Sequence, residues 1–176
     1  MHIVVDGYNL IRQSDVLRHH ERQSLEAGRK ALIHLLSGYK KNRGYSITVV
    51  FDGWLSGAPE EQRDREASID IIYSRRGEKA DEVIKRLVRR RTDEMIIVTS
   101  DRPVMDAAVR AGAAAIPSGE FEHRIRQAGN TFASGAANAG QYDDEDNPTS
   151  RGTKKKGPSH RSSKRERLKQ RGMDKL

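Results

Sequence analysis

Residues 3–9 read Ile3-Val4-Val5-Asp6-Gly7-Tyr8-Asn9, a short apolar run that ends in an aspartate and continues into small and polar side chains. Consecutive β-branched residues are typical of a strand that is buried on both faces. A polar cluster directly after such a strand lies at the carboxyl edge of a sheet, where open α/β sheets bind their ligands. This stretch therefore predicts the centre of a parallel sheet and the place of a functional site.

Outward from this strand, four more apolar runs have the length of strands: residues 47–51, 69–73, 95–99 and 114–116. Between most of them apolar residues recur at helical spacing, in residues 25–39, 80–88, 104–111 and 121–128. Apolar strands that alternate with amphipathic helices are typical of a sheet covered on both faces. The sequence predicts an α/β fold, an open doubly wound sheet of about five mainly parallel strands flanked by helices.

Charge and composition divide the chain. Of the 33 Lys and Arg residues, 11 lie in residues 151–176, which hold 2 of the 25 Asp and Glu residues. Residues 129–163 have almost no bulky apolar side chain, so they cannot bury enough surface to offset the entropy of ordering. Residues 164–176 could form a transient basic helix, but only Leu168, Met173 and Leu176 are apolar, too few for a packed face. We predict a domain over residues 1–128 and a disordered basic tail over residues 129–176.

Such a tail favours phosphate-rich partners, because binding releases counterions. The side chains expected to contact nucleic acid are Lys154, Lys155, Lys156, Arg161, Lys164, Arg165, Arg167, Lys169 and Arg171. The alternative is a solvated tail that only keeps the protein soluble.

Several classes of function lack their residues. The chain has no cysteine, which excludes disulfides, thiolate zinc sites and cysteine nucleophiles. Its six histidines show no ligand spacing, and neither a glycine-rich nucleotide-binding loop nor a Gly-x-Ser-x-Gly turn is present. No apolar run approaches the ~20 residues that span a bilayer, and no secretion signal is visible. We expect a cytoplasmic protein with no membrane contact and no nucleotide cofactor.

Four aspartates are predicted to meet at one edge of the sheet. Asp6, Asp52 and Asp101 follow three different strands, and Asp81 lies in the first turn of a helix. Clustered carboxylates repel one another unless a cation neutralises them. Hard oxygen ligands suit Mg²⁺ or Mn²⁺, and such a site can activate water for phosphodiester cleavage. The four are therefore predicted to be both metal ligands and catalytic residues.

Three of the aspartates also have a structural explanation, whereas Asp6, directly after a central strand and before Gly7, is harder to explain in this way. Asp101 could cap the helix that starts at Arg102-Pro103, Asp81 could be a first-turn acid, and Asp52 could belong to a turn. Three residues are predicted to support the site: Asn9 could orient a water or a phosphate, Ser100 could donate to a ligating carboxylate, and Asp106 could act through water. By helical periodicity Asp106 is expected to face solvent.

In combination these motifs resemble the YacP-like NYN domain family. The matching segments, in order, are Val4-Val5-Asp6-Gly7-Tyr8-Asn9-Leu10-Ile11, then Gly44-Tyr45 before Ile47-Thr48-Val49-Val50-Phe51-Asp52, then Lys79-Ala80-Asp81-Glu82-Val83-Ile84, then Val98-Thr99-Ser100-Asp101, and last Ser118 with Glu120-Phe121. The resemblance covers about residues 1–128, and the motifs are specific only together.

The resemblance implies a PIN-like fold, a divalent-cation site made of acidic side chains, and endoribonuclease activity. Carried over by position, the four aspartates fall on the acidic positions of the family and Asn9 falls on its asparagine. Residues 102–106 replace a more polar stretch that often contains Gln, which leaves the role of Asp106 open. The connection over residues 58–66 also looks variable.

The leading hypothesis is an endoribonuclease that hydrolyses RNA phosphodiester bonds with Mg²⁺ or Mn²⁺. A second is an RNA-binding or ribosome-associated adaptor with an inactive nuclease fold, which the intact set of aspartates argues against. A third is a structure-specific DNA nuclease. No residue pattern reads a 2′-hydroxyl, so the preference for RNA rests on the resemblance alone.

Overall fold

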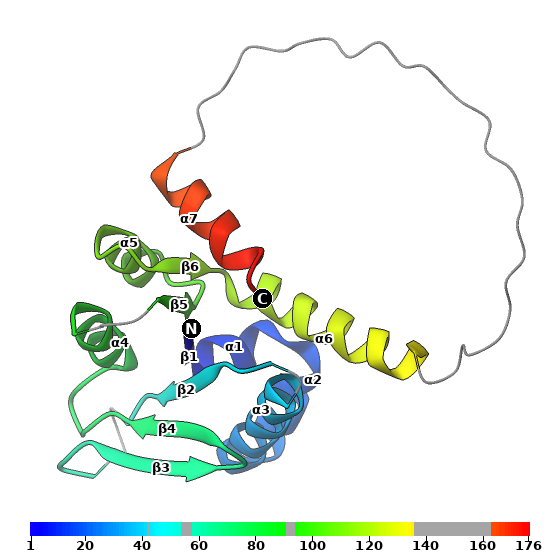
Figure 1. Cartoon of the computed structure of the whole chain (residues 1–176). Helices are drawn as coiled ribbons and strands as arrows, with labels where there is room; N and C mark the ends of the chain where they lie inside the picture. The colour runs from blue at the N-terminus through cyan, green and yellow to red at the C-terminus, as the bar shows by residue number, and fades with distance from the viewer. Residues whose placement is uncertain (42, 54–57, 91–93, 136–162) are drawn as a thin grey trace, which may run out of the picture.

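The computed structural model describes residues 1–41, 43–53, 58–90, 94–135 and 163–176, with the side chains of residues 129–135 left aside. The described residues form one sheet with helices on both of its faces (Figure 1). The strands are β1 (His2–Asp6), β2 (Ser46–Phe51), β3 (Gln62–Glu66), β4 (Ile69–Tyr73), β5 (Met95–Val98) and β6 (Ala114–Ile116). The helices are α1 (Gly7–Gln13), α2 (Asp15–Gln23), α3 (Leu25–Lys40), α4 (Ala80–Arg89), α5 (Arg102–Arg110), α6 (Ser118–Gly135) and α7 (Lys164–Met173).

The predicted doubly wound α/β sheet is confirmed. Its strands run in the order β3-β4-β2-β1-β5-β6, and all neighbours are parallel except β3 and β4. From β1 the chain first adds β2, β3 and β4 on one side of the sheet, and later β5 and β6 on the other side. The strand order therefore reverses at β1, which is the kind of position where such sheets bind ligands.

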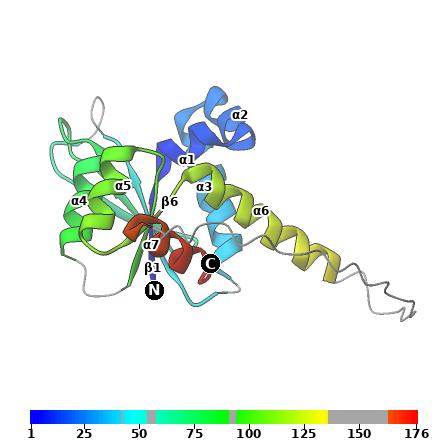
Figure 2. The same cartoon turned by 90° about the horizontal axis from the view of Figure 1, so that it is seen from above.

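Alternating side chains of the strands build two separate cores. Ile3 and Val5 of β1 lie in the core under α1, α3 and α6, whereas Val4 lies in the core under α4 and α5. Figure 2 shows the two helical layers on opposite sides of the strands. Because both faces are covered, the middle of each central strand is a nearly continuous apolar run, which is why these strands could be recognised in the sequence.

The sixth strand, β3, was not predicted from the sequence. All of its residues are polar and exposed, because it is an antiparallel edge strand with neither face covered by a helix. Two residues, Ala67 and Ser68, join it to β4, and both have positive φ angles of 48° and 66°. Such a hairpin normally carries Asn or Gly at these positions, so the sequence lacked both the apolar pattern and the turn signal.

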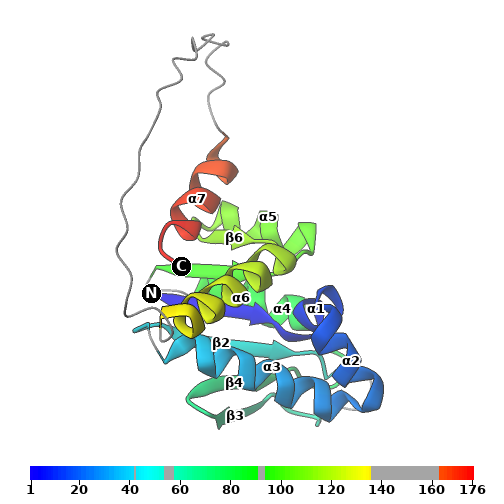
Figure 3. The ribbon, with the colours of Figure 1, turned by 90° about the vertical axis from the view of Figure 1, so that its right-hand side faces the viewer.

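The C-terminal segment differs from the predicted disordered tail. Helix α6 continues to Gly135, beyond the expected boundary at residue 128, and α7 packs against the edge strand β6 (Figure 3). Leu176 is buried in the core under α3 and α6, and its carbonyl oxygen accepts a 2.9 Å hydrogen bond from the Tyr39 hydroxyl. A helix with few apolar residues can pack here because Gly172 brings its backbone close to Ala114. Residues 136–162, which include the middle of the predicted tail, lie outside the described residues.

Ion pairs join α7 to the domain through its basic side chains. Arg165 lies 3.4 Å from Asp106, and Lys169 lies 2.5 Å from Glu120. Arg171 and Lys175 both contact Glu94, at 3.7 Å and 2.5 Å. Each pair is exposed and contributes little alone. Three of the side chains predicted to bind nucleic acid, Arg165, Lys169 and Arg171, thus have carboxylate partners within the protein.

The packing of α7 can be tested with two helical glycines. A Cβ at Gly172 would lie 2.7 Å from the Cβ of Ala114, whereas one at Gly38 in α3 would meet no atom within 4 Å. Glycine costs a helix about 1 kcal/mol relative to alanine. Gly38→Ala should therefore raise the free energy of unfolding by up to ~1 kcal/mol, and Gly172→Ala should lower it by about 1–2 kcal/mol. Urea denaturation of both variants measures the difference, and stabilisation by both would contradict the close approach.

Candidate active site

The carboxyl ends of β2, β1 and β5 bring three of the predicted aspartates to one edge. Asp6 is the last residue of β1 and pairs in register with Val50 of β2. Asp52 therefore lies two positions beyond Asp6 on one side. On the other side Val5 pairs with Val98, so Asp101 lies two positions beyond the level of Asp6. In the parallel register, Asp6 therefore lies deepest in this edge, at its base. Asp52 and Asp101 lie two residues farther out, at its rim.

Asp6 is a buried carboxylate with defined partners. It is only 7% exposed, and it caps the N-terminus of α1 by accepting a 3.2 Å hydrogen bond from the backbone N–H of Asn9. Its other oxygen accepts a 3.0 Å hydrogen bond from the hydroxyl of Thr99. Burial raises the pKa of Asp6 to about 6, and the nearby charges of Asp81 and Asp101 add to the rise while the two hydrogen bonds oppose it.

Asp81 and Asp101 lie across from Asp6 at the start of α4 and α5. Asp101 caps α5 by accepting a 3.1 Å hydrogen bond from the backbone N–H of Val104, so the predicted capping role is correct. The Thr99 hydroxyl oxygen accepts a 3.1 Å hydrogen bond from the Asp101 backbone N–H. Burial raises the pKa of Asp81, and the charge of Asp101 adds to this effect. The structure therefore groups three aspartates electrostatically, with Thr99 linking Asp6 to Asp101.

Thr99 was not predicted to take part in the site. It is fully buried at the carboxyl end of β5 and was read as the end of an apolar strand. A hydroxyl residue in a run that is otherwise apolar is the sequence signal that could have identified it, because a buried hydroxyl needs a hydrogen-bonding partner. Here its partners are the Asp6 carboxylate and the Asp101 backbone.

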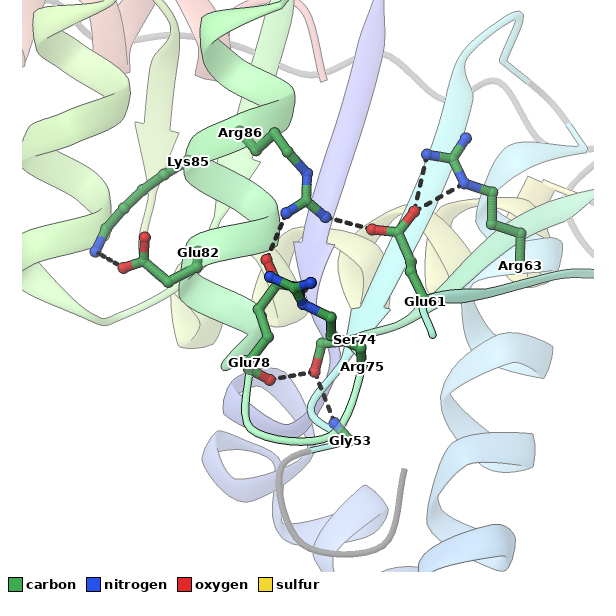
Figure 4. A network of polar contacts seen from close by, with 9 residues as sticks. All are labelled: Gly53, Glu61, Arg63, Ser74, Arg75, Glu78, Glu82, Lys85 and Arg86. Atoms are coloured by element: carbon green, nitrogen blue, oxygen red, sulfur yellow. Dashed lines mark hydrogen bonds and ion pairs between the residues drawn. The ribbon is translucent and has the colours of Figure 1, made fainter. Parts of the chain in front are cut away.

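Asp52 has a different neighbourhood from the other three aspartates. Its charge raises the pKa of Tyr8, although burial is the main cause of that rise, and Asp52 is not among the charges that act most on Asp6. The backbone after it is held by Ser74, whose hydroxyl accepts a 2.8 Å hydrogen bond from the Gly53 N–H and donates one of 2.6 Å to the Glu78 carbonyl (Figure 4).

A network of charges supports the segment that leads into α4. Figure 4 shows Arg86 between the carboxylates of Glu61 and Glu78, and Arg63 and Arg75 are the further ion-pair partners of Glu61 and Glu78 respectively. The Glu78 side chain is only 11% exposed, so this bridge is better shielded from water than the surface pairs. The network fixes the connection from β4 to the helix that carries Asp81.

The residues predicted to support the site have structural contacts of their own. The side-chain oxygen of Asn9 accepts hydrogen bonds from the Ser100 N–H at 2.9 Å and from the Ser118 hydroxyl at 2.8 Å. The Ser100 hydroxyl accepts a 3.2 Å hydrogen bond from the Ser118 N–H, so its described contact is to backbone and not to a carboxylate. Asp106 faces Arg165 of α7. Asn9 thus ties the turn after β1 to the segments after β5 and β6.

Gly7 directly follows Asp6, and close packing around it explains why this position holds a glycine. A Cβ added at this position would lie 2.4 Å from Cε1 of the buried Phe51 ring, closer than packed atoms can approach. Only glycine lets α1 start this close to β2. The backbone that positions Asp6 and Asn9 therefore depends on a residue with no side chain.

The three aspartates offer oxygen donors of the kind that a divalent cation binds. Among the described residues, no group of three acidic or histidine side chains is close enough to enclose a metal ion. Mg²⁺, however, usually keeps several waters and uses only one or two carboxylates together with substrate phosphates. The charges of Asp81 and Asp101 add to the rise in the pKa of Asp6, and the charge of Asp101 adds to that of Asp81, so these hard oxygen donors carry excess negative charge. Asp6, Asp81 and Asp101 therefore have the donor chemistry for such an ion, which they would hold together with the phosphate of a substrate.

The part of the chain that the structure describes contains no helix that is long and apolar enough to cross a bilayer.

Comparison with solved structures finds the same fold in Rae1 (YacP) from Bacillus subtilis. One crystal structure superposes with a TM-score of 0.64 at 24% identity and covers 78% of this chain and 80% of that chain. A mutant of the same protein gives a TM-score of 0.63 at 23% identity, over 76% of this chain and 79% of that chain.

Comparison of sequences finds the same group of proteins. The uncharacterized protein YacP of Bacillus subtilis (strain 168) is 31% identical over 87 residues, which are 49% of this chain and 51% of that protein. The aligned part thus spans about half the length of this curated relative. The family model for the YacP-like NYN domain matches residues 3–176, including α7. The chain therefore belongs to the YacP-like NYN domain family, with the PIN-like nuclease fold.

Proposed function

We propose that this protein is a divalent-metal-dependent endoribonuclease that cleaves RNA at the edge formed by Asp6, Asp81 and Asp101. The observation that carries the proposal is the burial of Asp6 beside two other carboxylates, which raises its pKa to about 6. A protein gains no stability from this arrangement, because burial and the charges of Asp81 and Asp101 make Asp6 harder to ionise. Such strain is expected where charge serves catalysis rather than folding.

The roles of the side chains follow from their positions. A bound Mg²⁺ or Mn²⁺ would supply activation of water and neutralisation of charge on the phosphate. Asp6 is held in one orientation by Asn9 and Thr99, so it is a fixed ligand at the base of the site. Asp81 and Asp101 stand at the starts of two helices, and Asp101 is held there by the hydrogen bond that caps α5. Asp52 is proposed as a fourth acid that acts from the β2 side, nearer to Tyr8.

Two competing functions predict different results in binding and cleavage experiments. An RNA-binding or ribosome-associated adaptor with this fold would bind RNA without cutting it. A structure-specific DNA nuclease would cut branched DNA in preference to RNA. RNA is preferred as substrate because of membership in the YacP-like NYN family, and a cytoplasmic location is proposed with it.

The proposal is tested by incubating purified protein with labelled RNA and DNA of the same sequence, in single-stranded and branched forms. With Mn²⁺ or Mg²⁺ we expect internal cuts in RNA, and with EDTA we expect none. Cutting in EDTA would contradict metal dependence, and cutting of branched DNA alone would favour the DNA nuclease. Binding of RNA without cutting under all conditions would favour the adaptor.

Metal binding should also be visible without substrate. A cation that binds only the folded acidic edge stabilises it by mass action, by about 2.7 kcal/mol at 100 times its dissociation constant. We expect millimolar Mn²⁺ to raise the melting temperature by several degrees in a thermal shift measurement. The same concentration of Na⁺ is the control for ionic strength. An unchanged melting temperature up to saturating Mn²⁺ would contradict binding of metal by the free protein.

A further inference from the structure

Aromatic rings gather at the carboxyl ends of the strands, on the face of the sheet covered by α1 and α3. Phe51 ends β2 and Tyr73 ends β4, and their rings stack with centroids 5.6 Å apart at an angle of 21°. Tyr8, in the first turn of α1, meets Phe51 edge to face at 5.2 Å. We call these three residues the aromatic cluster. It borders the edge that carries the aspartates, but lies on the other side of the sheet from α4 and α5.

Two guanidinium groups lie against the aromatic cluster. The Arg29 carbon Cζ is 5.6 Å from the centre of the Tyr73 ring and 6.0 Å from that of Phe51. The Arg12 carbon Cζ is 5.8 Å from the centre of the Tyr8 ring. Arg29 also donates from Nε to the carbonyl oxygen of Leu25 at 3.3 Å, a bond that does not use its two terminal nitrogens. The rings orient both side chains while leaving their positive charges in place.

These two arginines differ from others on the surface. Within the described ranges neither Arg12 nor Arg29 forms an ion pair with a carboxylate, whereas Arg18, Arg63 and Arg86 do. An arginine fork that is stacked on an aromatic ring and not neutralised suits bidentate contact with phosphate. Arg29 also lies within electrostatic reach of Tyr8, as Asp52 does. The cationic pair is therefore close to the β2 side of the proposed active site.

We propose that Arg12 and Arg29 form a phosphate-binding site for the polynucleotide backbone, on the α1 and α3 side of the strand ends. The inference rests on the proposed function and adds to it the path of the substrate. A single strand that crosses the carboxyl edge at β1 and β2 meets the aspartates on one side and the two arginines on the other. Anchoring phosphates away from the cleaved bond would hold the strand in place without reading its sequence.

The test measures binding without cleavage, in the Asp6→Asn background. Affinity for a labelled single-stranded RNA is determined over a range of salt concentrations, with and without Arg12→Gln and Arg29→Gln. Glutamine keeps much of the arginine stem and removes the charge. The control is Arg110→Gln, an exposed arginine at the far end of α5. Each lost phosphate contact should reduce the slope of log affinity against log salt by about 0.7, so the double variant should lose about 1.4 and the control close to zero.

The outcomes separate this inference from the proposed function. If the double variant keeps the slope of its parent, or if the control loses as much, the phosphate site is wrong even where the wild-type protein cuts RNA. If the slope falls as expected but the wild-type protein cuts nothing, the site stands and the nuclease proposal fails. Thermal denaturation checks folding, because Arg29 covers two rings of the core. Should that variant unfold, the single exposed Arg12→Gln change must still lower the slope by about 0.7.

Discussion

The Asp6→Asn substitution is expected to lower the rate of RNA cleavage by orders of magnitude. At pH 8 in EDTA, the variant is also expected to melt at a higher temperature than the wild-type protein. The substitution keeps the shape of the side chain and removes its charge. Loss of activity follows because the proposed ligand at the base of the site disappears. Gain in stability follows because a buried carboxylate that is repelled by Asp81 and Asp101 no longer has to ionise.

The gain in stability has a defined dependence on pH. Burial raises the pKa of Asp6 in the folded protein from 3.8 to about 6, so ionisation favours the unfolded chain. Wild-type stability should therefore fall as the pH rises from about 4 to about 6, and stay lower above that range. This loss corresponds to roughly 3 kcal/mol, of which the variant recovers about 2 because the Thr99 hydroxyl loses its carboxylate acceptor. At pH 8 the variant should melt roughly 5 °C higher than the wild-type protein, and the two melting temperatures should cross between about pH 4 and 5, below which the wild-type protein melts slightly higher.

The matched control is Asp64→Asn on the exposed strand β3, which removes the same charge far from the site. It should leave cleavage unchanged and shift the melting temperature little at any pH. Cleavage by the Asp6→Asn variant at a rate near that of the wild-type protein would contradict the assignment of the site. A lower melting temperature of this variant at pH 8 would instead mean that the Asp6 carboxylate stabilises the fold.

The elements predicted from sequence are those whose burial leaves a pattern. Five strands and four of the helices were recognised because each buries one or both faces. Strand β3 was missed because nothing covers its polar residues, and α1 and α2 because each is short and ends at a serine cap, Ser14 or Ser24. For residues 164–176 the sequence indicated at most a transient helix, and the packing of α7 on the domain was missed for another reason. Its packing depends on the absence of a side chain at Gly172, which no count of apolar residues detects.

The candidate site was predicted in part for an analogous reason. Carboxyl ends of parallel strands meet at one edge, so the aspartates could be placed there from sequence. Asp52 acts electrostatically on Tyr8 and is not among the leading charges on Asp6, a difference that a strand pattern does not define. Asn9 and Ser100 also make contacts that the sequence did not indicate. Their oxygens are used to join loops, and the hydroxyl that contacts Asp6 belongs to Thr99.

Removal of residues 163–176 is expected to lower the melting temperature by about 10 °C or more. The deletion exposes Ala114 and Ile116 of β6 together with the pocket that holds Leu176, and it removes the partner of the Tyr39 hydroxyl. Burial of one leucine alone contributes about 1.5–3 kcal/mol, and the surrounding contacts bring the expected loss to about 3–5 kcal/mol. A chain cut after residue 128 should lose at least as much, contrary to the expectation that residues 1–128 form the whole domain.

Replacement of Lys154, Lys155 and Lys156 by glutamine should have the opposite effect, with RNA binding weakened and stability unchanged. These residues lie outside the described part of the chain, and their expected role comes from charge alone. The variant should melt like the wild-type protein, while the slope of log affinity for single-stranded RNA against log salt should fall by about 2. Measuring both properties for both variants separates residues that complete the fold from residues that contact RNA.

The two variants together decide what the basic C-terminal region does. If deletion of residues 163–176 leaves the melting temperature unchanged, α7 is not part of the folded domain and its ion pairs with Glu94, Asp106 and Glu120 are incidental. If the lysine variant keeps the full salt slope, the excess charge does not bind RNA, and a solubilising role is the better account. We expect neither result. Basic side chains that are paired with carboxylates on α7 gain little from phosphate, because they must first give up those partners. Contact with RNA is therefore expected to come from the lysines before α7 and not from the helix itself.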